Sequence, residues 1–192
     1  LERQGAGSGC TRCDGAGENQ VAVCRVATAD FSLLGFSSEQ KGAVLVQLEI
    51  PLDSVAALAV SVPVFRADNA APATALPAAV VERADLIIVN ETEYALLPQL
   101  ADARLVAVTY GADGAAIRRD GVEVARVPSP RVDVVSSVGA GDAFCAALTV
   151  ALHAGWDDEA ALTAACAVGA DAVRHPSARP PLRPLESYVT TR

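Results

Sequence analysis

Residues Ser136–Gly155, "SSVGAGDAFCAALTVALHAG", place a glycine-containing loop and an aspartate directly before a long apolar run. The run predicts a buried helix from about Asp142 to His153. Gly139 and Gly141 let the backbone turn with its amides pointing outward, and the helix N-terminus adds partial positive charge. We therefore expect a helix whose first turn can hold an anion.

Around this stretch, apolar segments of strand length alternate with helical segments. We predict strands over 21–27, 42–50, 62–69, 84–90, 104–111 and 131–137, and helices over 51–60, 91–97 and 157–174. The Asp120-Gly121 pair between two alternating runs predicts a hairpin over 114–127. The alternation predicts an α/β fold in which a mainly parallel sheet carries helices on both faces.

The chain reads as one domain with less regular ends. Polar and glycine-rich residues over 1–20 predict a loop or frayed end, and 70–77 predict a further loop. One domain is expected over 21–184. A Pro-rich, irregular segment closes the chain, and we assign its last residues, 185–192, to a C-terminal tail.

The composition is that of a globular chain, since 52% of its 192 residues are hydrophobic and 20% are charged. A formal net charge of −8 makes binding to nucleic acid phosphates unfavourable. The apolar runs are too short to span a bilayer, and the sequence does not start like a signal peptide. We expect a cytoplasmic protein that binds neither nucleic acid nor membrane.

The five cysteines are Cys10, Cys13, Cys24, Cys145 and Cys166. The spacing of Cys10 and Cys13 is that of half a zinc site, but no second pair accompanies it. We interpret the cysteines as unpaired thiols in a reducing compartment.

Asp142 has two interpretations. As a carboxylate beside a phosphoryl site, it could accept a proton from an attacking hydroxyl. Alternatively, it caps the helix that follows the glycine loop. The residues of this stretch by themselves leave both open.

Three further candidates lie at the ends of predicted strands. Asn90 and Glu93 form either a capping box or a phosphate site in which Glu93 holds Mg²⁺ through water. Thr109 and Gly111 either approach a phosphate or simply leave a strand. Glu49 either faces solvent or meets a partner such as a sugar hydroxyl. All of these, together with Asp142, are expected at the carboxyl ends of strands, facing one crevice.

Five segments in this order resemble the ribokinase family of carbohydrate kinases, over about residues 14–184. They are "QLEIP" (47–51), "NAAPA" (69–73), "DLIIVNETE" (85–93), "VTYGADG" (108–114) and "SSVGAGDAFCAAL" (136–148). The resemblance implies a three-layer ribokinase-like fold with a mainly parallel sheet flanked by helices. It also implies that this chain begins inside the domain, without the N-terminal part and most of the lid.

For the transfer step, the resemblance implies that Asp142 binds the sugar and deprotonates its hydroxyl. Gly139, Ala140 and Gly141 would form the anion hole, and Glu49 would contact the sugar.

For the nucleotide, the resemblance implies that Asn90, Thr109, Gly111 and Gly114 bind ATP. Glu93 would serve Mg²⁺ through water.

The implied reaction is ATP-dependent phosphorylation of a sugar hydroxyl, with D-ribose converted to ribose 5-phosphate. A non-catalytic or incomplete nucleotide-binding remnant, and a fructose or nucleoside kinase, are the alternatives. The family usually has Asp-Thr, which helps to bind a monovalent cation, and a Gly-Ala beside that cation site. This chain has Ser136-Ser137 and Ser177-Ala178 instead, so we do not expect activation by a monovalent cation. A homodimer is an option that the incomplete lid leaves open.

Overall fold

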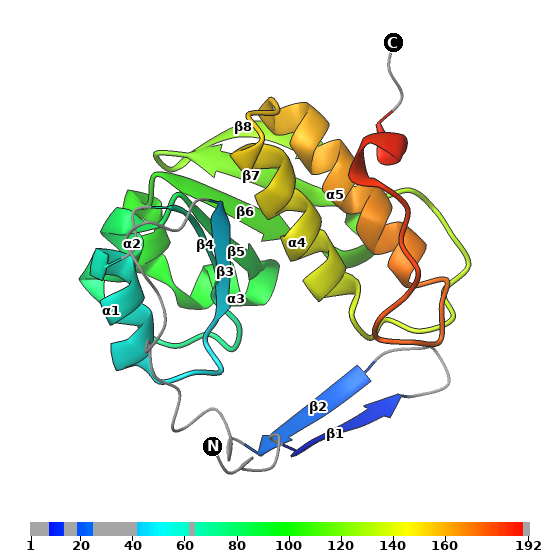
Figure 1. Ribbon diagram of the computed structural model, residues 1–192, viewed down its shortest axis with the longest axis horizontal. Coiled ribbons are helices and arrows are strands. Elements are labelled where there is room, and N and C mark those ends of the chain that lie inside the picture. The colour runs from blue at the N-terminus through cyan, green and yellow to red at the C-terminus, as the bar shows by residue number, and fades with distance from the viewer. Residues whose placement is uncertain (1–7, 14–18, 25–41, 62–63, 190–192) are drawn as a thin grey trace.

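The computed structural model describes residues 8–13, 19–24, 42–61 and 64–189, with side chains in the last two ranges (Figure 1). Its centre is a six-stranded sheet with the order β3-β4-β5-β6-β7-β8. The strands are β3 (Ala43–Gln47), β4 (Phe65–Asn69), β5 (Leu86–Asn90), β6 (Leu105–Thr109), β7 (Ala115–Arg119) and β8 (Val122–Val127). Strands β3 to β6 are parallel, whereas β7 and β8 are antiparallel additions at one edge.

Helices cover both faces of this sheet (Figure 1). One face carries α1 (Leu52–Ser61) and α2 (Ala78–Arg83), and α3 (Glu91–Leu96) follows β5 directly. The other face carries α4 (Ala140–His153) and α5 (Asp158–Ala172), which pack against each other. Short 3-10 helices are η1 (Pro98–Asp102), η2 (Gly111–Asp113) and η3 (Leu185–Tyr188). The expected three-layer α/β fold is therefore confirmed.

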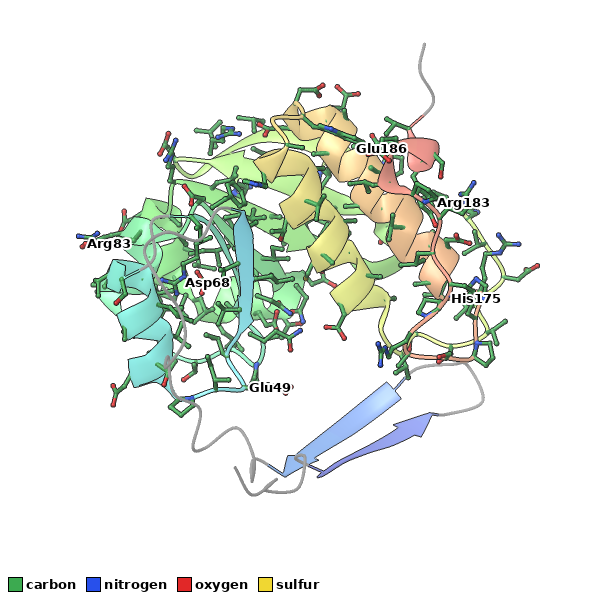
Figure 2. All side chains as sticks on the ribbon, viewed as in Figure 1. Glu49, Asp68, Arg83, His175, Arg183 and Glu186 are labelled. Atoms are coloured by element: carbon green, nitrogen blue, oxygen red, sulfur yellow. The ribbon has the colours of Figure 1, made fainter. Side chains whose placement is uncertain are left out.

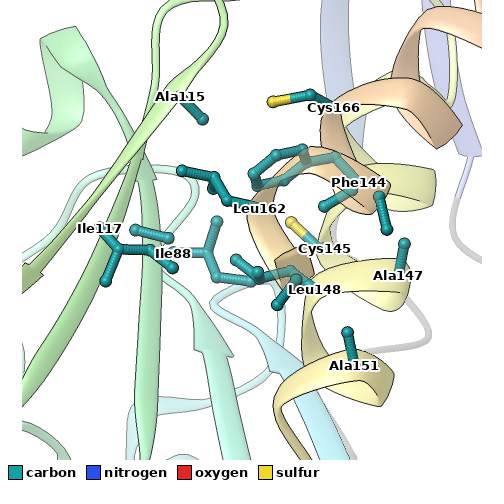
Figure 3. Close-up of a cluster of buried hydrophobic side chains, with 14 of the residues drawn as sticks. Ile88, Ala115, Ile117, Phe144, Cys145, Ala147, Leu148, Ala151, Leu162 and Cys166 are labelled. Carbon is teal, nitrogen blue, oxygen red and sulfur yellow. The ribbon is translucent and has the colours of Figure 1, made fainter. Parts of the chain in front are cut away.

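The central strands are apolar throughout because both of their faces are covered. In β5, Ile88 packs toward α4 and α5, whereas its neighbour Ile87 packs toward α1 and α2. Figure 3 shows the first of these cores, where Ile88 and Ile117 meet Leu148 of α4 and Leu162 of α5. The period-2 alternation of a strand thus divides one apolar run between two cores.

The predicted hairpin is present as β7 and β8. Asp120 and Gly121 form its turn with φ angles of 49° and 77°. Two positive φ angles are what a two-residue hairpin turn requires, and the Asp-Gly sequence accommodates them.

Three regions differ from expectation. The strand predicted over 131–137 is absent: this segment crosses the end of α5, where Val135 and Ser136 both donate backbone hydrogen bonds to the carbonyl of Val173. Its valines are half exposed, as shown by Val134 at 54% and Val135 at 56%, because none of the described strands pairs with this segment. An alternating pattern produces a strand only where a partner strand is available.

The second difference is at the N-terminus, where a loop was predicted through residue 20. β1 (Ser8–Cys13) and β2 (Asn19–Cys24) instead form a two-stranded antiparallel sheet of their own. Pairing of this kind relies on backbone hydrogen bonds, which a polar, glycine-rich composition does not reveal. Residues 25–27 of the strand predicted over 21–27 lie outside the described residues.

Helix α2 was also missed, because the sequence pattern over 78–83 is short. None of the helices in the described ranges has the length and apolarity needed to cross a membrane.

Candidate active site

A cavity of about 660 Å³ opens beside the first turns of α4. Three segments line it: the turn after β6, the loop before α4, and facing stretches of α4 and α5. The lining includes Thr109, Gly111, Gly114, Arg131, Ser137, Ala140, Gly141, Phe144 and Gly169. Five residues predicted from two separate motifs are therefore brought to one cavity.

The two glycines at the mouth of α4 have different surroundings. Gly139 is the N-cap, with φ 81°, and a Cβ placed on it would lie 2.5 Å from the carbonyl oxygen of Ala178. A Cβ on Gly141 would meet nothing within 4 Å. Gly139 is therefore required by the backbone and by packing, whereas Gly141 leaves open space at the cavity.

Asp142 does not cap α4, so the structural alternative for this residue is wrong. The N-cap is Gly139, and no side chain of the described residues makes a capping hydrogen bond there. The Asp142 carboxylate is exposed, and its Oδ1 accepts a 2.7 Å hydrogen bond from Nε2 of Gln47, the last residue of β3. Asp142 therefore lies at the carboxyl end of β3, on the first turn of a helix.

Asn90 and Glu93 form a complete capping box at the start of α3. The amide of Glu93 donates to Oδ1 of Asn90, and the amide of Asn90 donates to Oε2 of Glu93, both at 2.8 Å. Partial burial raises the pKa of Glu93, and the hydrogen bond from the Asn90 amide opposes this rise. The capping-box interpretation of these two residues is thus correct. A role of Asn90 or Glu93 toward phosphate or Mg²⁺ stays a prediction.

Cys145 is a buried residue of α4 that lies three positions after Asp142. Burial raises the pKa of Cys145 to about 12, and the negative charges of Asp142 and Glu93 contribute further to the rise. The charges of Asp142 on α4 and Glu93 on α3 therefore act on the same thiol, although 49 positions separate the two residues in the sequence.

The remaining candidates have structural roles as well. A Cβ on Gly114, with φ 98°, would overlap the carbonyl of Val127 and lie 2.7 Å from Cα of Pro128. The hydroxyl of Thr109 donates to the carbonyl of Val89 at 3.4 Å. Glu49 lies half-buried in the turn after β3, at the end of that strand, and outside the cavity lining (Figure 2).

The arrangement can be compared with known proteins. A model of the pfkB family carbohydrate kinases matches residues 15–184. The chain belongs to this family. Ribokinase of Bacillus subtilis (strain 168) is 33% identical over 164 residues, covering 76% of this chain and 55% of that protein. The chain thus spans about half the length of this curated relative.

Solved structures of ribokinases share the fold of this pfkB-family chain. The enzyme of Thermotoga maritima has a TM-score of 0.75 at 22% identity, covering 97% of this chain and 67% of its own. Arabidopsis thaliana ribokinase, complexed with ribose and ATP, has 0.74 at 24%, covering 95% and 67%. Burkholderia thailandensis nucleoside kinase, in complex with inosine, has 0.72 at 21%, covering 90% and 62%.

Sequence reasoning missed several residues of this pfkB-family site. Arg131, Phe144 and Cys166 line the cavity, and Gln47 holds Asp142. A polar Gln47 inside the otherwise apolar run "AVLVQL" (43–48) was an available indication. The other three were not foreseeable, because only the packing of α4 against α5 and the course of the 129–137 loop bring them to the cavity.

Proposed function

We propose that this protein is an ATP-dependent kinase that phosphorylates a hydroxyl of a small sugar, with D-ribose as the substrate. The observation that carries the proposal is the mouth of α4. There an exposed carboxylate, Asp142, follows a glycine turn next to a large cavity. Family membership and the 33% identity with a ribokinase support the same reaction.

The cavity suits the nucleotide. Its walls combine bare backbone, at Gly111 and Gly141, with apolar surface such as Phe144. Bare backbone lets phosphate oxygens approach amide groups, while apolar side chains accept a purine face. The ribokinase of Arabidopsis thaliana was solved with ribose and ATP, and that of Cryptococcus neoformans var. grubii serotype A with ADP, which supports a nucleotide here.

The first turn of α4 supplies the anion hole. Amides in the first turn of a helix have no carbonyl partner within the helix, and the helix dipole places partial positive charge there. Gly139, Ala140 and Gly141 would direct such amides at the transferring phosphoryl group. Negative charge that develops on its oxygens is then stabilised by dipoles that are already oriented.

Asp142 would act as the base. Its carboxylate takes the proton of the sugar hydroxyl as that oxygen bonds to the γ-phosphorus and the bond to the ADP oxygen breaks. Glu49, in the turn after β3, would hold the sugar. The proton ends on Asp142, ADP leaves with the bonding electrons, and the sugar carries the phosphoryl group.

Glu93 would hold Mg²⁺ at the site through water. Within the described ranges, no group of three His, Cys, Asp or Glu side chains could hold a metal ion by itself. One carboxylate, completed by water and phosphate oxygens, nevertheless fits the way proteins bind Mg²⁺ with nucleotides. When bound, the ion would neutralise charge on the phosphates. We expect no activation by potassium, because Ser136 and Ser177 supply neutral oxygens in place of the family's usual residues.

The buried thiols fit a reducing compartment, since Cys145 and Cys166 are both free. We therefore propose a cytoplasmic location for this kinase.

The test is phosphoryl transfer followed by ³¹P NMR, with ATP–Mg²⁺ and each of ribose, fructose and inosine. Ribose should give ADP and a sugar phosphate fastest. Faster turnover of inosine would favour a nucleoside kinase, which the shared fold of the Burkholderia thailandensis enzyme makes the second candidate. ATP binding without transfer to any acceptor would leave a non-catalytic nucleotide-binding domain.

A further inference from the structure

The side chain of Gln47, at the end of β3, hydrogen-bonds a residue in the first turn of α4. Its Nε2 donates to Oδ1 of Asp142 at 2.7 Å, across 95 positions of sequence. Within the described part of the chain, no other hydrogen bond reaches the Asp142 carboxylate. The described residues therefore leave the second oxygen of that carboxylate without a hydrogen bond, so it can accept a proton. The contact is specific in direction, because Gln47 donates and an ionised carboxylate can only accept.

We propose that Gln47 is a positioning residue that orients the Asp142 carboxylate toward the sugar hydroxyl. The inference rests on the proposed role of Asp142 as the base. An aspartate in the first turn of a helix can also turn toward neighbouring backbone amides, which would remove it from the substrate. A fixed donor on one oxygen selects a single orientation and presents the other oxygen.

Both partners of this bond are held by buried neighbours. Val46 and Leu48 flank Gln47 at 6% and 1% exposure, and they belong to the core under α1 and α2. Phe144 and Cys145, just beyond Asp142, belong to the core on the opposite face. The Gln47 side chain therefore spans from one rigid element to another, so the orientation it imposes is well defined.

A neutral donor suits this task better than a cation. An Arg or Lys beside Asp142 would stabilise the carboxylate strongly and make it a weaker base. The amide of Gln47 carries no charge and does not titrate, so it fixes geometry with a smaller effect on basicity. Gln47 also joins the strand that leads to Glu49 with the helix that carries Asp142, which sets the spacing of sugar contact and base.

The hydrogen bond can be tested without any turnover. In the full chain, the side-chain amide of Gln47 is observed by ¹⁵N NMR and the carboxyl of Asp142 by ¹³C NMR over a pH titration. The two signals should move together, with one midpoint, and Asp142→Asn should abolish the movement at Gln47. Glu93 is the neighbouring carboxyl, so Glu93→Gln should leave the Gln47 response in place. Cys145, with a pKa of about 12, does not titrate in the range used. A Gln47 signal that ignores the Asp142 titration overturns the inference.

Kinetics then test positioning as opposed to mere packing. Gln47→Leu should lower kcat for ribose by about ten- to a hundred-fold and leave the KM for ATP unchanged, because a misplaced base affects the chemical step. Gln99→Leu, a half-buried glutamine in η1 far from Asp142 in the chain, serves as the control and should keep wild-type kcat.

If Gln47→Leu fails to fold, Gln47→Glu takes its place, since it keeps the size but repels the carboxylate. A Gln47 variant that folds with wild-type kcat overturns the inference. A wild-type chain without phosphoryl transfer overturns the proposed function instead, and the NMR titration then decides alone whether Gln47 holds Asp142.

Discussion

The two faces of the sheet differ in whether their charged side chains are exposed or buried. On the α4–α5 side, the core is apolar and the carboxylate of Asp142 lies exposed at the mouth of α4. On the α1–α2 side, Arg66 and Asp68 of β4 are buried inside the core, at 4% and 0% exposure. Asp68 lies between α1 and β3 in Figure 2. The exposed carboxylate can meet a substrate, whereas the buried pair can affect only stability.

The buried pair is incompletely satisfied among the described residues. The Nη2 of Arg66 donates to Oδ1 of Asp68 at 2.7 Å and to the carbonyl of Val55 at 3.1 Å. Three further atoms of the pair have no hydrogen-bond partner among the described residues: Nε and Nη1 of Arg66, and Oδ2 of Asp68. Burial raises the pKa of Asp68, and the positive charge of Arg66 only partly opposes the rise. This face therefore carries an electrostatic cost that the other face avoids.

The largest effect is expected at the exposed carboxylate. Asp142→Asn should lower phosphoryl transfer by about 10² to 10⁴-fold, equal to about 3 to 5 kcal/mol of barrier, because Asn cannot accept the hydroxyl proton. ATP binding, measured by calorimetry, and the thermal midpoint should stay close to wild type. Near wild-type turnover would remove Asp142 from the chemistry.

The next effect concerns the buried pair. Arg66→Met should lower the free energy of unfolding by about 3 kcal/mol at pH 8, because it leaves Asp68 charged and unpaired in the core. The pKa of Asp68 is already raised, so its protonated form becomes favourable as pH falls, and the loss should be smaller at pH 5. Urea unfolding at both pH values measures this.

A double variant serves as the control for the buried pair. Arg66→Met with Asp68→Leu should recover most of the lost stability, since an apolar pair needs no partner. A double variant as unstable as Arg66→Met alone would show that packing, not charge, governs this site.

The two glycines at the mouth of α4 form a matched pair. Gly139→Ala should cost about 2 kcal/mol or more, because its φ of 81° disfavours a side chain and its Cβ would meet Ala178. Gly141→Ala should fold as well as wild type but weaken nucleotide binding, because its Cβ projects into open space at the cavity. Melting curves and ATP calorimetry separate the two, and equal losses of stability would contradict the assignment.

Thiol reactivity tests how closed the α4–α5 core is. The pKa of Cys145 is raised to about 12 and that of Cys166 to about 11, both mainly by burial. At pH 8 their thiolate fractions are then roughly 10⁻⁴ and 10⁻³. Peptide mapping after brief iodoacetamide treatment should find both unmodified in the folded protein and modified in urea. Fast labelling of Cys166 would indicate that the cavity opens in solution.

The smallest effect is expected at the capping box. The pKa of Glu93 is raised by burial, so its contribution to stability is complete below its unfolded pKa and is lost as pH rises through the folded pKa. Gln keeps the capping box, so Glu93→Gln should match or slightly exceed wild-type stability at pH 8, by about 0.5 kcal/mol or less. Partial exposure of Glu93 keeps the difference small. A clear loss at pH 8 in thermal melts would contradict this.

Local signals in the sequence determined most of the elements. Three elements were predictable from their own residues: the Asp120-Gly121 turn, the apolar strand before Asn90 and the long helix after Gly141. Turn geometry and hydrophobic periodicity act over only a few residues, so a short stretch is enough to show them. The motif order also placed Thr109, Gly111 and Gly141 as candidates for one crevice, and the cavity brings these three together. Their roles toward nucleotide and sugar stay predictions.

Contacts across the chain were decided only by the tertiary structure. The pattern over 131–137 is that of a strand, yet no strand among the described residues pairs with it, and the segment binds the end of α5 instead. The sequence predicted Gly139 only as part of an anion hole, whereas the structure shows that its backbone also lies close to Ala178. The bond from Gln47 to Asp142 joins residues 95 positions apart. Sequence periodicity reports burial and local conformation, whereas partners this distant are fixed by how β3 and α4 pack, which no short stretch encodes.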